Sequence, residues 1–443
     1  MDSRDIVLSV LMDIETKNTF SNIALSKALS KNQFEDKTVR AFITRLSEGV
    51  MEYKITLDYV INQFSKTKVN KCKPLIRCLL RMGTYQILYM DGVPDSAACN
   101  EAVKLAKKHG FGSLSGFVNG VLRNISRNKD NIPEPKYDKK SAEYLSIKYS
   151  MPLWLCEKIK NDYPDKYLRI LEGSFLDRDT SIRVNTNKIS RDELKKLIED
   201  TGIEVEYGYY DEKALLVSNY DFIKKIPGYK QGYFSVQDES SMCAIRAAGI
   251  KKGDLVADVC AAPGGKTTCA AEYLMGEGIV YSMDISAEKL SLIEDNAQRL
   301  GLDNVRIFAH DATVALTNKD IYGEAKDNQE QIISEFADVV IADLPCSGLG
   351  IIGRKNDIKY RISEEQIKEL VDLQREILDV VNDYVVSKGI LVYSTCTINP
   401  QENHENLMWF LGKYNNFTLV EEKLFLQGID NCDGFYYAVM KKA

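Results

Sequence analysis

This 443-residue chain has no Cys-x-x-Cys pair, few histidines and no long apolar run. Its ten cysteines are scattered with no Cys-x-x-Cys pair, and only three histidines are present, so structural zinc is not expected and no metal is predicted. No run approaches the roughly 18 apolar residues of a membrane span. Charged residues interrupt the first 16 positions, which argues against a signal peptide. The chain is therefore expected to be cytoplasmic, thiol-reduced and independent of membranes.

Net positive charge is also lacking overall, but not at the start of the chain. The formal net charge is −6, yet residues 1–130 carry 20 Lys and Arg against 13 Asp and Glu, a net of +7, and the remaining 313 residues carry a net of −13. An acidic body with a basic N-terminal part is expected when an appended module docks the substrate. Random drift of charge between domains is the alternative.

Apolar residues recur at helical spacing throughout the first part, which predicts an all-helical bundle over residues 1–133. The three clearest sets are Ile6, Val7, Val10, Leu11 and Ile14; Val39, Phe42, Ile43, Leu46 and Val50; and Phe117, Val118, Val121, Leu122 and Ile125. Basic residues are predicted on the other helix faces, namely Lys73, Arg77 and Arg81, and then Lys104, Lys107 and Lys108. These faces either contact nucleic acid or are merely solvated.

The segment Ile132-Pro133-Glu134-Pro135-Lys136 predicts a stiff connector, after which residues 134–230 mix short helices with strand-like pieces. We expect a small α+β subdomain there. Arg183 and Asn185 alternate with apolar neighbours and would share one face of a strand. That face could meet an RNA phosphate or base edge, or it could be an ordinary exposed strand face.

Residues 231–443 alternate strands and helices, as in a doubly wound α/β sheet. A capping box at Ser363 and Gln366 predicts a helix over 364–387, and the polar stretch 317–335 predicts an exposed insertion. The run 434–440 predicts a last strand, added at the end of the sheet. Seven strands are expected, at 255–260, 279–284, 305–311, 337–343, 389–395, near 418–420 and at 434–440.

The turn after the first of these strands predicts a cofactor site. Gly265-Lys266-Thr267 imitates a phosphate loop, but the glycine that a Walker motif requires is replaced by Cys260, and the pattern is not GxGxxG. Asp284 ends the second strand, where a carboxylate binds ribose hydroxyls, and His310-Asp311 ends the third, near an adenine amino group. These features favour S-adenosylmethionine over NAD. The predicted cofactor residues are Cys260, Ala261, Ala262, Pro263, Gly264, Gly265, Lys266, Asp284, Asp311 and Asp343.

Two cysteines follow strand-like runs in this same half of the chain, in Asp343-Leu344-Pro345-Cys346-Ser347-Gly348 and Ser394-Thr395-Cys396. A buried small hydrophobe is the usual fate of a free thiol. The placement of both thiols at strand ends beside a cofactor turn instead favours covalent chemistry.

These motifs, with Asp-Val-Cys-Ala-Ala-Pro-Gly-Gly-Lys-Thr at 258–267, resemble the RNA cytosine-C5 methyltransferases. The stretch Gly116-Phe117-Val118-Asn119-Gly120-Val121-Leu122-Arg123-Asn124 resembles the NusB-like RNA-binding domain. The pairing is similar to the bacterial 16S ribosomal RNA methyltransferase B family, also called Sun or Fmu, over nearly the whole chain. It implies a NusB-like bundle at 1–133, an α+β RNA-binding subdomain at 134–230 and a Rossmann-like, seven-stranded class I methyltransferase domain at 231–443.

The resemblance also implies roles. Cys396 would add to carbon 6 of a flipped-out cytosine, because carbon 5 is otherwise too weak a nucleophile to accept a methyl group. Asp343 would hydrogen-bond the base, and Cys346 would assist loss of the carbon-5 proton. Glu402 is predicted to close a capping box with Asn399, and His404 to be solvated. The implied partner is 16S ribosomal RNA, free or early in small-subunit assembly, bound by a monomer.

One departure from the family stands after the Cys346 loop. The family tends to read Arg-His-Pro-Asp, and this chain reads Arg354-Lys355-Asn356-Asp357. We expect the segment to lie beside the substrate. Two other functions stay open: a transfer RNA cytosine-C5 methyltransferase, and a non-catalytic RNA-binding factor for ribosome assembly or antitermination.

Overall fold

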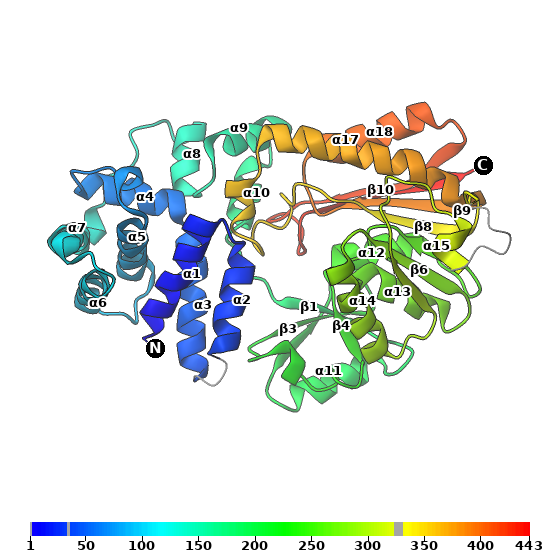
Figure 1. The fold of residues 1–443 in the computed structure, drawn as a ribbon, viewed down its shortest axis with the longest axis horizontal. Coiled ribbons are helices and arrows are strands. Elements are labelled where there is room, and N and C mark those ends of the chain that lie inside the picture. The colour runs from blue at the N-terminus through cyan, green and yellow to red at the C-terminus, as the bar shows by residue number, and fades with distance from the viewer. Residues whose placement is uncertain (1, 33–35, 323–330) are drawn as a thin grey trace. The chain divides into compact units, whose positions relative to one another are not determined.

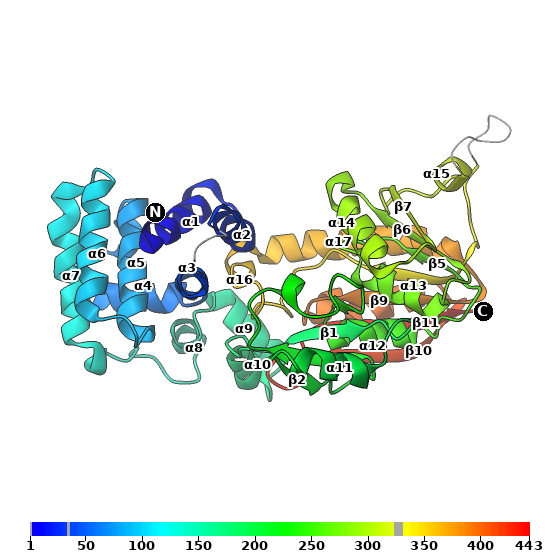
Figure 2. The same cartoon turned by 90° about the horizontal axis from the view of Figure 1, so that it is seen from below.

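Helices with one apolar face build the first of two units, which comprises Met1–Glu172 and Ile352–Arg361 (Figure 1). The computed structural model describes residues 2–32, 36–322 and 331–443. Helices α5, α6 and α7 lie side by side (Figure 2), and the predicted periodicity is confirmed because Val118, Leu122 and Ile125 are fully buried. The helices are α1 (Ser3–Lys17), α2 (Ser21–Lys31), α3 (Lys37–Glu52), α4 (Lys54–Phe64), α5 (Pro74–Tyr89), α6 (Asp95–Lys108), α7 (Ser115–Arg127), α8 (Ala142–Lys148), α9 (Leu153–Asp162) and α10 (Tyr167–Gly173).

One of the two predicted basic faces is wrong. Arg81 on α5 is buried, and its guanidinium pairs with Asp58 at 2.7 Å and with Glu15 at 3.1 Å. Arg77 also pairs with Glu15. An (i, i+4) row of arginines here neutralises acidic groups of neighbouring helices instead of facing solvent. The lysines of α6, at 104, 107 and 108, are exposed.

The segment Ile352–Arg361, which includes α16 (Ile358–Arg361), packs within this helical unit although it follows the Cys346 loop in the chain. The Asp357 carboxylate accepts from the Ser21 N–H at 2.9 Å, and Lys359 Nζ donates to the Glu52 carbonyl at 2.9 Å. Both side chains are buried. Asp357 and Lys359 therefore anchor the segment and are not exposed for contact with RNA.

An antiparallel sheet of order β2-β3-β1-β4 forms the middle of the chain and belongs to the second unit, Gly173–Ile351 and Ile362–Ala443. A capping box formed by Ser190 and Glu193 begins its helix α11. The expected α+β subdomain is confirmed. Its elements are β1 (Thr180–Val184), α11 (Arg191–Glu199), β2 (Glu204–Tyr207), β3 (Ala214–Ser218) and β4 (Phe234–Val236).

The strand face that carries Arg183 and Asn185 is buried. Both predictions made for it, a contact with RNA and an ordinary exposed face, are therefore wrong. Arg183 pairs with Glu272 at 2.9 Å and donates to the Gly265 carbonyl at 3.0 Å. Asn185 donates to the Gly232 carbonyl at 3.3 Å. The face packs against helix α13 (Gly265–Leu274), and no surface is left there for RNA.

The described residues of 231–443 form a seven-stranded sheet of order β10-β11-β9-β8-β5-β6-β7, which confirms the predicted class. The last strand does not lie at the end of the sheet: β11 pairs antiparallel with both β9 and β10. The strands are β5 (Leu255–Asp258), β6 (Ile279–Asp284), β7 (Val305–Ala309), β8 (Ala337–Asp343), β9 (Val385–Thr395), β10 (Phe417–Phe425) and β11 (Phe435–Lys442).

Alternate strand residues bury opposite faces of this sheet. Val340 and Tyr393 pack with helices α17 and α18, whereas Ile341 and Val392 pack with α12 and α13. Because β5, β8 and β9 are parallel neighbours, their carboxyl ends lie along one edge of the sheet. The remaining helices are α12 (Glu239–Ala247), α14 (Ala287–Leu300), α15 (Asn318–Tyr322), α17 (Glu364–Val381) and α18 (His404–Lys413).

Two local predictions concern α17 and the insertion before β8. The capping box of Ser363 and Gln366 begins α17 as expected, although the helix ends at Val381, before the predicted residue 387. Residues 323–330 of the insertion predicted at 317–335 lie outside the described residues. Within the described part of the chain, every helix is too short or too polar to cross a bilayer.

Candidate active site

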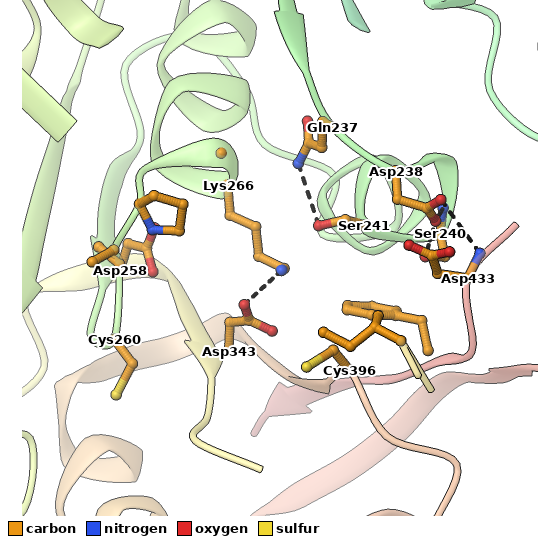
Figure 3. A pocket seen from close by; sticks show the side chains of 16 residues that line it. Gln237, Asp238, Ser240, Ser241, Asp258, Cys260, Lys266, Asp343, Cys396 and Asp433 are labelled. Carbon is orange, nitrogen blue, oxygen red and sulfur yellow. Dashed lines mark hydrogen bonds and ion pairs between the residues drawn. The ribbon is translucent and has the colours of Figure 1, made fainter. Parts of the chain in front are cut away.

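A cavity of about 210 Å³ opens at the carboxyl ends of β5, β8 and β9 (Figure 3). The sheet brings these ends together because the three strands are parallel neighbours. The predicted residues that line it are Cys260, Ala261, Ala262, Pro263, Gly265, Lys266, Asp343 and Cys396. The turn after β5, the end of β8 and the loop after β9 therefore meet as one site.

The turn after β5 leaves no room for a side chain at Gly264. Gly264 has φ +99°, and a Cβ there would lie 3.1 Å from Ile293. It stands at the N-terminus of α13, so the following backbone N–H groups are available to an anionic group. The turn can thus hold a ligand by backbone alone.

Asp258 at the end of β5 is a fully buried carboxylate in the wall of this cavity. Its Oδ2 accepts from Thr267 Oγ1 at 2.6 Å, while its Oδ1 is buried without a hydrogen-bond partner. Burial, reinforced by the charge of Asp343, raises the pKa of Asp258 to about 7. A cationic donor in the cavity would satisfy that oxygen and favour the ionised form.

Asp343 and Lys266 form an ion pair across the cavity (Figure 3), with 2.6 Å between Oδ2 and Nζ. The Ser394 hydroxyl donates to the other carboxylate oxygen at 2.8 Å. The ammonium also lies 4.9 Å from the centre of the Phe435 ring. A polar pair beside an aromatic face suits a planar, polar ligand.

The two cysteines of the motifs converge, with 3.2 Å between the sulfurs of Cys346 and Cys396. Cys396 lines the cavity, whereas Cys346 is not among the lining residues. The hydrogen bond to Cys396, then burial and the negative charge of Glu402, raise the pKa of the Cys346 thiol well above its usual value. Cys346 therefore keeps its proton and can donate it in a hydrogen bond to the Cys396 sulfur.

Asp284 ends β6 as predicted, whereas β7 ends at Ala309, before Asp311, and neither carboxylate lines this cavity. The carboxylate of Asp284 accepts from the N–H groups of Ala262 at 3.1 Å and Ser286 at 2.9 Å. Hydrogen bonds from Thr313, first its backbone N–H and then its hydroxyl, lower the pKa of Asp311. Asp284 thus fixes the turn, and the ribose and adenine roles of the two residues stay predictions.

Half of the cavity wall was missed from the sequence. The missed lining residues are Gln237, Asp238, Ser240, Ser241, Asp258, Ile351, Asp433 and Phe435. Asp238 has an ordinary structural explanation, since it caps α12 by accepting from the Ser240 N–H at 3.0 Å. Asp433 precedes the last strand with no motif around it. Only strand pairing reveals that these segments face Cys396.

Comparisons with known proteins agree along the chain. Residues 247–441 match the family described as 16S rRNA methyltransferase RsmB/F, residues 1–127 the NusB family, and residues 151–221 the RsmF/B-like ferredoxin-like domain. The chain is 35% identical to the probable ribosomal RNA small subunit methyltransferase B of Bacillus subtilis, over 94% of this chain and 89% of that protein. It is 30% identical to the probable counterpart from Synechocystis over the full length of both.

Solved structures share the fold. The crystal structure of PH0851 superposes with a TM-score of 0.83 at 26% identity, over 100% of this chain and 99% of that one. NSun6 from Pyrococcus horikoshii superposes with a TM-score of 0.56 at 20% identity, over 66% of this chain and 98% of that one, which supports the fold alone.

Proposed function

The chain belongs to the ribosomal RNA small subunit methyltransferase B family, and from this membership we propose that it methylates carbon 5 of a cytosine in 16S ribosomal RNA. The observation that carries the proposal is the pair of sulfurs 3.2 Å apart beside a glycine-turn cavity. A class I fold alone would not select this chemistry.

The residues of the cavity fit S-adenosylmethionine as the methyl donor. The buried Oδ1 of Asp258 needs a donor, and the ammonium of a methionine moiety supplies one. The N-terminus of α13 offers N–H groups to the carboxylate of the same moiety. When bound, this cofactor supplies a methyl group activated by a sulfonium.

Cys396 is the proposed nucleophile, because of the two converging cysteines, Cys346 and Cys396, it is the one that lines the cavity. Its thiolate forms a bond to carbon 6 of cytosine, and the electron pair of the carbon 5–carbon 6 double bond then becomes available at carbon 5. Carbon 5 takes the methyl group. Loss of the carbon-5 proton restores the double bond and expels the Cys396 thiolate.

Cys346 is the proposed assistant in that last step. Before Cys396 adds to carbon 6, the hydrogen bond between the two sulfurs is the largest cause that raises the pKa of Cys346. Once the Cys396 sulfur is bonded to carbon 6, that cause is removed and the Cys346 pKa falls. Cys346 can then release its own proton to solvent, and the resulting thiolate accepts the carbon-5 proton, directly or through a water molecule.

Asp343 and Lys266 are proposed to hold the base. Asp343 would accept from the exocyclic amine and stabilise the ring at N3, and the ammonium of Lys266, 2.6 Å from the carboxylate, would supply a donor. A base held this way has left its stack, so the target is an unpaired or loop cytosine. The α6 lysines would contact phosphates of the surrounding RNA.

Nucleoside analysis tests the proposal. The purified protein is incubated with 16S ribosomal RNA and with transfer RNA, each with S-adenosylmethionine carrying an isotopically labelled methyl group, and the RNA is digested to nucleosides for mass spectrometry. Labelled 5-methylcytidine from the ribosomal RNA is expected. Label only in the transfer RNA would identify the alternative substrate, and no label in either RNA would contradict the proposed activity.

A further inference from the structure

Glu402 is a fully buried carboxylate to which the reaction described above assigns no role. It ends the short helix η6 (Pro400–Glu402) that follows Cys396. The capping box predicted for it is not formed as expected. Asn399 does cap this helix, by accepting from the Gln401 N–H at 3.4 Å, but the Glu402 carboxylate is directed to other partners.

Four donors meet this carboxylate. Its Oε1 accepts from the Ser347 N–H at 2.7 Å and from Gln374 Nε2 at 3.2 Å. Its Oε2 accepts from the Ser347 hydroxyl at 2.5 Å and from Asn399 Nδ2 at 2.8 Å. All four partners donate, so the site is built for a charged acceptor.

Three of the four donors come from the segments that carry the two sulfurs. Ser347 is adjacent to Cys346, and Asn399 lies three residues after Cys396. Gln374, on α17, also donates to the Pro345 carbonyl at 2.8 Å, on the other side of Cys346. One carboxylate therefore joins both loops and braces the Cys346 loop on its two sides.

We propose that Glu402 is a positioning residue that fixes Cys346 against Cys396, so that the release step follows methyl transfer. The inference rests on the proposed function, since it concerns the second half of the same reaction. The negative charge of Glu402 adds to the hydrogen bond from Cys396 and to burial in raising the pKa of Cys346. Glu402 thereby also helps to keep Cys346 protonated until Cys396 is consumed.

Glu402→Gln removes one of the two acceptor oxygens at nearly constant volume. The new amide group would face two donors, either on Ser347 or on Asn399 and Gln374, and the Cys346 loop would shift. Ser347→Ala is a second, milder variant that removes one hydrogen bond from the other side. Glu405→Gln, an exposed carboxylate on α18, is the matched control for the loss of charge.

Three quantities are measured for each variant: binding of S-adenosylhomocysteine by calorimetry, multiple-turnover methylation, and the fraction of protein covalently attached to RNA on a denaturing gel. For Glu402→Gln we expect cofactor binding near wild type, turnover lowered by about a hundredfold, and a several-fold higher covalent fraction. Ser347→Ala should change in the same directions by less, and Glu405→Gln should match wild type.

The fraction of protein covalently attached to RNA distinguishes a residue that positions Cys346 from one that only supports the fold. If turnover and covalent fraction fall together in Glu402→Gln or in Ser347→Ala, the residue only supports the fold and the inference is overturned. Wild-type turnover in Glu402→Gln overturns it equally. If Glu402→Gln fails to bind the cofactor, the turnover and covalent fraction of Ser347→Ala decide whether the inference stands. Absence of 5-methylcytidine with the wild-type protein would instead be a failure of the proposed function, and it is seen before any variant is compared.

Discussion

The Cys396 sulfur stands in the cavity wall, 3.2 Å from a thiol that keeps its proton. Cys396→Ala is expected to lower methylation at least about a thousandfold, which corresponds to roughly 4 kcal/mol of barrier. The physical reason is that the unactivated ring does not attack a methyl group. Binding of S-adenosylhomocysteine should survive, because the cofactor residues are untouched. Cys72→Ala, in the helical unit, is the control, and near-normal turnover in Cys396→Ala would exclude the covalent route.

We expect Asp258 to make cofactor binding depend on pH. Its pKa is raised to about 7, so below pH 7 the free protein carries a proton there that must leave when an ammonium binds. Affinity for S-adenosylhomocysteine should therefore rise with pH, by up to about tenfold per unit below pH 7, and level off above it. The contribution of Asp258 to the folding stability of the cofactor-free protein has the opposite pH dependence. It is greatest at low pH, where the carboxyl group is protonated, and declines as the pH rises towards 7.

Calorimetry in two buffers of different ionisation enthalpy checks the proton release at pH 6. Asp258→Asn, which cannot titrate, should remove both the proton release and the slope. A pH-independent affinity in the wild type would show that this oxygen does not meet the ammonium.

Some residues could be assigned from the sequence and others could not. Cys346, Cys396 and Asp343 were found because each ends a strand in a motif. Arg81 and Glu402 were misread because local spacing reports the face or the turn on which a side chain lies, and not what is packed against it. Glu402 and Ser347 are 55 residues apart in the chain, and they come into contact only because β8 and β9 pair.

At the scale of elements, β1 is attached to α13 through Arg183. This arginine is fully buried, donates to the Gly265 carbonyl at 3.0 Å and pairs with Glu272, which is also buried. Arg183→Met leaves an unpaired buried charge and should destabilise the fold by about 3–5 kcal/mol. Because Gly265 begins α13, whose N-terminus is proposed to bind the cofactor, affinity for S-adenosylhomocysteine should fall as well.

The double variant Arg183→Met with Glu272→Leu is the control for this effect. It removes both charges, so thermal unfolding should return most of the way to wild type. Cofactor affinity should stay low, because the bond to the Gly265 carbonyl is still missing. A single variant as stable as wild type would contradict the buried ion pair.

The elements themselves were largely predictable and their neighbours were not. Apolar runs and strand-end motifs indicated all seven strands, but β11 was misplaced because sequence order does not reveal that it inserts between β9 and β10. The alternation around Arg183 correctly predicted a strand with two faces. It could not show that a second layer, α13, covers the polar face.

At the scale of the whole molecule, the positive charge of residues 1–130 is the feature assigned to RNA docking. Changing Lys104, Lys107 and Lys108 together to Gln should weaken RNA binding and reduce the log-log salt slope by about 0.7 to 0.9 for each phosphate that is no longer neutralised. Lys104 pairs with Glu101 and Lys108 with Asp5, and both ammonium groups are exposed to an approaching phosphate. The Asp5 carboxylate is buried and keeps His109 as a partner when Lys108 is changed. Fluorescence anisotropy at several salt concentrations measures the slope.

Changing Lys251, Lys252 and Lys289 to Gln is the matched control, since these exposed lysines carry the same charge in the acidic unit. Equal salt slopes of RNA binding for the two triple variants would show that the α6 lysines do not dock RNA. Deleting residues 1–130 is a poorer test. It would strip Ser21 and Glu52 from Asp357 and Lys359 and leave the segment after the Cys346 loop without its anchors.

If cytosine is methylated while it is bonded to Cys396, a trapped peptide must carry a nucleotide of defined mass. Cys346→Ala is incubated with 16S ribosomal RNA and S-adenosylmethionine, and the covalent species is digested with protease and nuclease for tandem mass spectrometry. We expect a methylated cytidine nucleotide on the peptide that contains Cys396, because release is impaired after methyl transfer. Full turnover with no attached nucleotide, or attachment at another residue, would contradict it.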